Sequence, residues 1–134
     1  MRILLLVLAL LASGPALAGG DDVIRCNPDG NQRELDQCAA DELAAADAEL
    51  NETWRQVLAR AGEGVARDRL EAAQRLWIQL RDADLEARFP LAEGQDPRVM
   101  YGSMYPMERA SARAALTRQR NEWLRATFLE AESP

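Results

Sequence analysis

The chain has 134 residues, a formal net charge of −6 and neither histidine nor lysine, so that every basic residue is arginine. These absences exclude histidine bases and metal ligands, serine–histidine or cysteine–histidine nucleophile pairs, Schiff-base lysines and phosphate-binding P-loops. The acidic balance disfavours nucleic acid and anionic membrane surfaces as partners and suits a cationic partner. The other explanation of this charge is solubility alone.

The first 18 residues follow the pattern of a secretory signal peptide. Arg2 supplies the basic start, residues 3–12 form an apolar core too short to span a bilayer, and Ala16-Leu17-Ala18 fits the small-x-small cleavage rule. We expect cleavage after Ala18. Residues 19–134 should then form a single domain in a periplasm or outside the cell, with no membrane insertion and one charge more acidic than the precursor.

The two cysteines are Cys26 and Cys38. In an oxidising compartment an even pair predicts one structural disulfide, here closing a loop of about 13 residues and contributing roughly 3 kcal/mol. The spacing is too wide for a CxxC redox motif, and two cysteines without histidine do not make a zinc site.

Three helices are predicted, and together they indicate an all-α fold. The first begins near Asn31, where Glu34 completes a capping box, and it ends at residues 62–64, Gly-Glu-Gly. The second runs from about Val65 to Arg88 and ends before Phe89-Pro90. The third starts around Pro106 and reaches about residue 128. We expect an antiparallel helical bundle or hairpin arrangement of these helices with a disulfide-tied N-terminal segment.

The second helix is the one around which the others are expected to pack. Its apolar stripe at helical spacing consists of Leu70, Ala73, Trp77, Leu80 and Ala87. Residues 91–105, between the second and third helices, form a long connection. Its methionines and tyrosines either fold back to close one end of the bundle or form an exposed functional loop.

Polar residues lie on or beside the stripes of all three helices. They are Asp47, Asn51, Gln74, Arg81, Thr117 and Arg120. One interpretation is that they reach solvent at the stripe edges. The other is a satisfied network between helices, in which Arg81 and Arg120 share Asp47 and so fix the helix register. Trp54, Trp77 and Trp123, one on each helix, are core anchors or else a stacking surface for a ligand.

Carboxylates are plentiful, but nothing in the sequence places two of them in a cleft with unequal environments, as glycosidase chemistry requires. Their spacing with arginine is typical of a solvated helix face. EF-hand spacing is absent from the sequence. No catalytic residue, cofactor or metal site is predicted.

Four stretches, taken in order and spacing, resemble the LprI-like lysozyme-inhibitor family. They are AADAELN (45–51), AQRLWIQLRDADL (73–85), GSMYPM (102–107) and LTRQR (116–120). The resemblance runs from Cys26 to about Trp123. It implies a small secreted helical protein that binds and inhibits lysozyme-type muramidases, with a cationic lysozyme as partner. The alternative is a periplasmic interaction or structural module with another partner, including a second copy of itself.

Within the connection, the candidate partner-binding loop consists of Gly102, Ser103, Met104 and Tyr105, and Ser103 and Tyr105 are the groups expected to enter a sugar-binding cleft. The family usually carries cysteines where Leu85 and Ala112 stand here. Their joint absence implies that those two cysteines pair with each other in relatives. It follows that Cys26 pairs with Cys38, and that Leu85 and Ala112 lie close together.

Overall fold

The computed structural model describes residues 23–131, and over that range it contains helices and no strand. The elements are α1 (Gln32–Ala61), α2 (Val65–Arg88), α3 (Pro97–Tyr101), α4 (Tyr105–Leu124) and a π-helical turn, η1 (Arg125–Leu129), that continues α4. The predicted all-α class is confirmed. The predicted signal peptide lies outside the described residues.

The ends of the helices follow the local sequence. The Asn31 side chain accepts hydrogen bonds from the backbone N–H groups of Arg33 and Glu34, and the Glu34 carboxylate accepts from the Asn31 N–H at 2.8 Å. This is the predicted capping box. At the other end of α1, Gly62 has φ of 66°, a left-handed conformation that costs glycine little. Because proline disfavours helix in the residue before it, α2 ends before Phe89-Pro90.

A disulfide joins Cys26 to Cys38, as predicted. It ties the segment that precedes α1 to the second turn of that helix. Because the two cysteines are 12 positions apart, the bond closes a short loop and restricts the unfolded chain.

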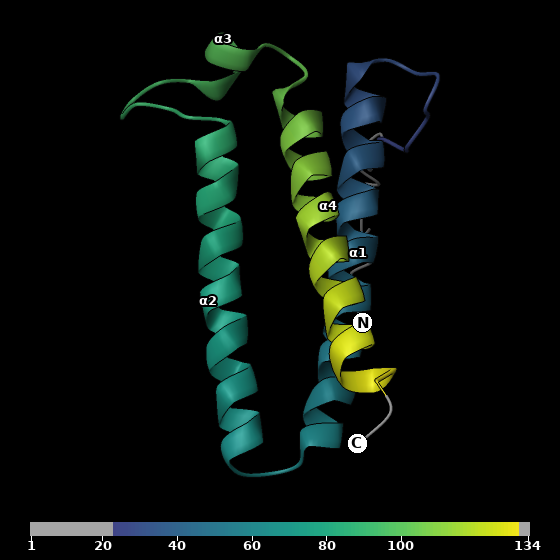
Figure 1. Cartoon of the computed structure of the whole chain (residues 1–134). Coiled ribbons are helices and arrows are strands. Elements are labelled where there is room, and N and C mark those ends of the chain that lie inside the picture. Colours follow the sequence, from purple (N-terminus) through teal and green to yellow (C-terminus); the bar gives the residue numbers. More distant parts are fainter. Residues whose placement is uncertain (1–22, 132–134) are drawn as a thin grey trace, which may run out of the picture.

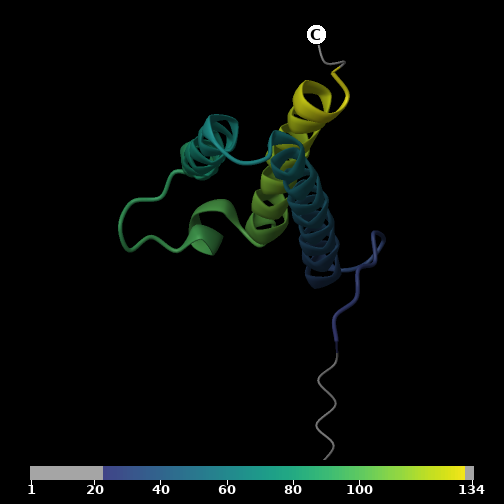
Figure 2. The same cartoon turned by 90° about the horizontal axis from the view of Figure 1, so that it is seen from below.

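Two long helices, α1 and α4, form a pair, and the third long helix, α2, lies at the side of this pair. α1 and α4 run in the same direction and lie alongside each other, α2 runs antiparallel to both, and α3 bridges α2 and α4 (Figures 1 and 2). The α1–α4 contact is the most extensive in the molecule. The buried residues of these two helices are Ala39, Ala46, Leu50, Thr53 and Val57 on α1, with Ala112, Ala114, Thr117, Asn121 and Leu124 on α4.

The expectation that the other helices pack around α2 is wrong. α2 buries only Arg81 and Leu85, and Leu80 of its predicted stripe is 60% exposed. α1 and α4 pair instead because small residues such as Ala46 and Ala114 let them approach closely. Their charges also attract, since α1 carries seven acidic and three basic residues whereas α4 carries two acidic and four basic ones.

Two hydrophobic clusters form the core. Towards the α1–α2 turn, Leu50, Val57 and Leu124 are buried and are covered by Trp54, Leu70, Trp77, Phe128 and Leu129. Towards α3, Leu85, Phe89 and Ala112 form the second cluster. The expectation that Leu85 and Ala112 lie close together is therefore confirmed. None of the helices between residues 23 and 131 is long and apolar enough to cross a membrane.

Candidate partner-binding surface

Three aromatic rings pack together at the end of the molecule where α3 lies, here called the α3 end. Phe89, at the end of α2, lies edge-on to Tyr101 and Tyr105, with ring centroids 5.7 and 5.6 Å away, and the two tyrosine rings stack on each other at 5.6 Å. The Tyr101 hydroxyl donates a hydrogen bond to the Pro90 carbonyl at 2.7 Å. These contacts hold α3 against the junction of α2 and α4.

The connection itself is ordered by its own polar groups. Asp96 caps α3 by accepting a hydrogen bond from the Arg98 N–H at 2.7 Å, and Gln95 accepts from the Ala92 N–H at 2.8 Å. Gly102 ends α3 with φ of 79°. The predicted long connection thus contains a short helix and a defined turn, because residues suited to N-caps and to positive φ stand where they are needed.

This end presents apolar side chains to solvent. Val99 is 81% exposed, and Met100 and Met104 are each about half exposed. The sequence left open whether the side chains of residues 91–105 fold back onto the bundle or stay exposed. The tyrosines fold back, whereas the methionines face outward. In the predicted loop, Ser103 is exposed next to Gly102, whereas Tyr105 is only partly exposed because its ring belongs to the aromatic cluster.

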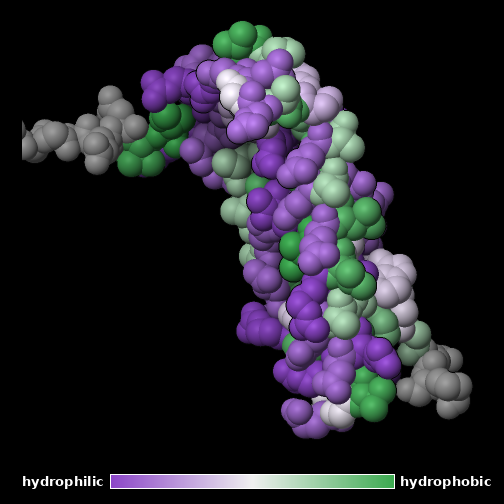
Figure 3. Space-filling view, turned by 90° about the vertical axis from the view of Figure 1, so that its left-hand side faces the viewer, coloured by the Kyte–Doolittle hydropathy of each residue, from purple (hydrophilic) through white to green (hydrophobic). Residues whose placement is uncertain are grey.

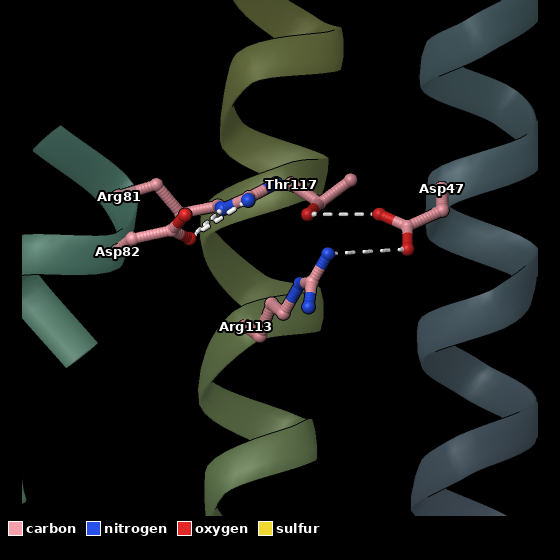
Figure 4. Close-up of polar contacts among 5 residues, drawn as sticks. All are labelled: Asp47, Arg81, Asp82, Arg113 and Thr117. Atoms are coloured by element: carbon pink, nitrogen blue, oxygen red, sulfur yellow. Dashed lines mark hydrogen bonds and ion pairs between the residues drawn. The ribbon is translucent and has the colours of Figure 1, made fainter. Parts of the chain in front are cut away.

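The predicted polar residues divide into separate groups. Asp47 on α1 accepts a hydrogen bond from the Thr117 hydroxyl of α4 at 3.5 Å, and Arg113 Nη2 lies 3.9 Å from the same carboxylate (Figure 4). The prediction did not include Arg113, although it stands one turn before Thr117 on the same face of α4. Asn51 is exposed on α1.

The expectation that Arg81 and Arg120 share Asp47 is wrong. Arg81 pairs with the adjacent Asp82, at 2.7 Å between Nη2 and Oδ1, and Arg120 donates to Gln74 at 3.0 Å. The reason is the arrangement of the helices. Thr117 and Arg113 of α4 point to α1, while Arg81 approaches α4 from α2, on the other side (Figure 4).

Arginine and tryptophan side chains alternate at the interface of α2 and α4. The Arg81 guanidinium lies 5.2 Å from the Trp77 ring, and that of Arg120 lies 5.6 Å from Trp77 and 4.6 Å from Trp123. Such contacts suit arginine because its flat cation stacks on aromatic faces. Desolvation by burial lowers the pKa of the Arg120 guanidinium. Trp54 and Trp77 pack on the core as predicted, whereas Trp123 is half exposed.

Over residues 23–131, no group of three or more acidic or cysteine side chains is arranged to hold a metal ion. The structure presents exposed apolar side chains on the ordered α3 end, and arginine contacts help to hold the helices beneath it together.

A family model described as "Lysozyme inhibitor LprI" matches residues 25–124. The chain belongs to the lysozyme inhibitor LprI family. An uncharacterised protein of Rhizobium meliloti (strain 1021) is 35% identical over 120 residues, which cover 81% of each chain. No solved structure matches the chain significantly.

In this LprI family member, three of the four stretches that carry the resemblance supply interface residues. Asp47 belongs to the first, Gln74 to the second and Thr117 to the last, and each makes a hydrogen bond to another helix. Arg81, also in the second, is buried and approaches α4 (Figure 4). Only residues 102–107 reach the surface of the α3 end. The family pattern in this chain therefore describes mainly how the helices are held together.

Proposed function

We propose that this LprI family member is a secreted or periplasmic binding protein that inhibits lysozyme-type muramidases and performs no chemistry itself. The observation that carries the proposal is the family match over residues 25–124. Lysozyme acts through two carboxylates that flank the bond to be cleaved in its sugar chain. A protein that occupies the sugar-binding cleft blocks this chemistry without altering it.

The α3 end is the part of the chain best suited to enter such a cleft. Val99, Met100 and Met104 are exposed apolar side chains on a protrusion that is already ordered by the aromatic cluster and by the Asp96 cap. Ordering before binding lowers the entropy cost of association. Ser103 adds an exposed hydroxyl beside them. Tyr105 acts mainly by supporting this end from below, because its ring already packs on Phe89.

Charge supports the same partner. The chain has a net charge of −6, and the acidic excess is concentrated on α1, several of whose carboxylates are exposed. Many lysozymes are basic, and complementary fields of this kind accelerate encounter more than they tighten the final complex. Inhibition of a basic lysozyme is therefore expected to set in more slowly as the salt concentration rises.

The test is a muramidase assay with residues 19–134 against lysozymes of several classes. Val99→Asp and Met100→Asp are expected to weaken inhibition by about tenfold or more, because each places a charge in an apolar contact. Ser103→Ala and Tyr105→Ala test the loop itself. Leu76→Asp on α2, also at an exposed apolar position, is the matched control and should inhibit normally. Absence of inhibition at micromolar excess against every class would refute the proposal.

A second candidate function is self-association through the outer face of α2. Leu76 and Leu80, one turn apart, are 66% and 60% exposed, and Val65 lies on the same stripe. Figure 3, which faces α2, displays hydrophobic residues along this helix between hydrophilic ones. A two-fold antiparallel pairing of α2 helices would set Leu76 against Leu80 of the other copy. A molecular mass that rises with concentration, and that Leu76→Glu returns to one chain, would favour it.

A further inference from the structure

A groove of about 550 Å³ lies at the end of the molecule opposite α3. Its walls come from the end of α1, the first half of α2, and the end of α4 with η1. The residues that line it are Val57, Arg60, Ala61, Ala66, Arg69, Leu70, Ala73, Arg120, Trp123, Thr127, Phe128 and Ala131. The groove exists because α2 stands away from the α1–α4 pair and presents alanines, Ala66 and Ala73, where larger side chains would fill the space.

The charge of this groove is opposite to that of the whole chain. Among the residues that the structure describes, its lining includes three arginines and no carboxylate, although the chain has a net charge of −6. Arg60 is engaged, since it donates to the Leu129 carbonyl at 2.7 Å. Arg69 is exposed, and its side chain makes no hydrogen bond or ion pair with the described residues. A cationic rim on an apolar groove is the complement of a molecule with an apolar body and an anionic head.

Arg120 gives this groove a fixed cation. Its Nε donates to Gln74, and its guanidinium is held between Trp77 and Trp123. Its Nη2 is buried and has no hydrogen-bond partner among residues 23–131. Because Arg120 lines the groove, an anionic oxygen bound there is the acceptor that suits this cation best. Trp123, half exposed beside it, offers an aromatic face to an alkyl chain.

We propose that this groove binds a single-chain anionic amphiphile, namely a long-chain carboxylate, with its alkyl chain along Leu70, Trp123 and Phe128. Its head group lies between Arg120 and Arg69. The volume of the groove falls within the range of small-molecule sites, about 300–1,000 Å³. The proposal goes beyond lysozyme inhibition and is independent of it, since the α3 end takes no part in this groove.

The test uses dodecanoate, below its micelle concentration, with residues 19–134. Because Trp123 lines the groove, intrinsic tryptophan fluorescence reports binding, and calorimetry gives the dissociation constant. Saturable binding at one site is expected. Dodecanol and dodecyltrimethylammonium, which keep the chain but lack the anion, should bind at least about tenfold more weakly, as expected when a charged pair is lost. Equal binding of dodecanol would overturn the anionic part of the proposal.

Variants distinguish the contribution of the arginines to binding from the contribution of the shape of the groove. Arg120→Gln and Arg69→Gln should each weaken dodecanoate binding several-fold and leave dodecanol binding nearly unchanged. Arg75→Gln, on another face of α2, is the matched control. Ala73→Phe should abolish binding by filling the groove, whereas Ala83→Phe, exposed on α2 outside it, should not. Circular dichroism and the melting temperature check folding. Binding that survives Ala73→Phe, or that never saturates, would refute the proposal.

Discussion

Arginine is the only type of basic residue in this chain, and its contacts between the helices are ones that lysine could not make. Arg81 and Arg120 lie against the Trp77 ring while their polar atoms reach Asp82 and Gln74. Lysine has no flat face to stack in this way and no fork of donors. The sequence indicated that polar residues lie between the helices, but it did not indicate their partners. A long side chain such as Arg81 can reach either its own neighbour or another helix, and periodicity does not distinguish the two.

The pair of Arg81 and Asp82 provides a test at this scale. Arg81 is 9% exposed, so replacing its partner by Asp82→Asn leaves a buried cation without a countercharge. We expect the free energy of unfolding to fall by about 1–2 kcal/mol, less than for a fully buried pair because Asp82 is half exposed. Arg81→Met should cost less, since it removes the charge and keeps the packing.

Urea denaturation of the two variants measures this difference. Asp84→Asn is the control, because Asp84 is exposed on the same helix, and it should change stability by no more than about 0.5 kcal/mol. If Arg81→Met proved more destabilising than Asp82→Asn, the ion pair would matter less than the packing of the arginine stem on Trp77.

The limits of the helices could largely be predicted from the sequence, but which of the helices pack most closely against each other could not. Caps, glycines and prolines are local signals, and they gave the limits of α1 and α2 correctly. α2, however, has two apolar stripes. Leu70, Trp77 and Leu85 face the other helices, whereas Leu76 and Leu80 face solvent. A pattern of apolar residues does not state which stripe is buried. That depends on the alanines and opposite charges that draw α1 and α4 together.

The docking of α2 on α4 can be tested by a disulfide. Leu85→Cys with Ala112→Cys introduces cysteines at two positions of one buried cluster, and these should form a bond on oxidation. The new bond should raise the free energy of unfolding by about 3–4 kcal/mol by the chain-entropy relation for a loop of this length, if native geometry is kept. Free-thiol titration and urea denaturation measure both effects.

The matched control is Leu80→Cys with Ala112→Cys. Leu80 is 60% exposed and faces away from α4, so this pair should stay reduced. A bond that formed equally well in both variants would mean that α2 rotates freely beside α4, and the register described here would be wrong.

As a whole the molecule is asymmetric, with one tight helix pair and one lightly held helix. α2 is fixed to α4 near its end by Leu85 and Phe89. In its first half, the Gly62–Gly64 turn joins it to α1, and beside the groove Leu70 is its contact with the core cluster of the pair. The two proposed surfaces therefore lie at opposite ends. The sequence did not reveal the groove, because it is formed by spacing between helices that are distant in the chain. The resemblance gave the family, but most of its stretches build interfaces and do not mark the binding surface.

This asymmetry predicts two levels of stability, which hydrogen exchange can measure residue by residue. Opening α2 exposes less apolar surface than separating α1 from α4, since Arg81 and Leu85 are its only buried residues. Amides at 66–80 should therefore exchange by local opening, at lower free energy than those of the buried stretches of α1 and α4, which should require global unfolding. Equal protection in all three helices would contradict this description of the core. Dodecanoate should slow exchange at 66–73 if the groove binds it, because the ligand would add contacts between α2 and the pair to the one that Leu70 already makes.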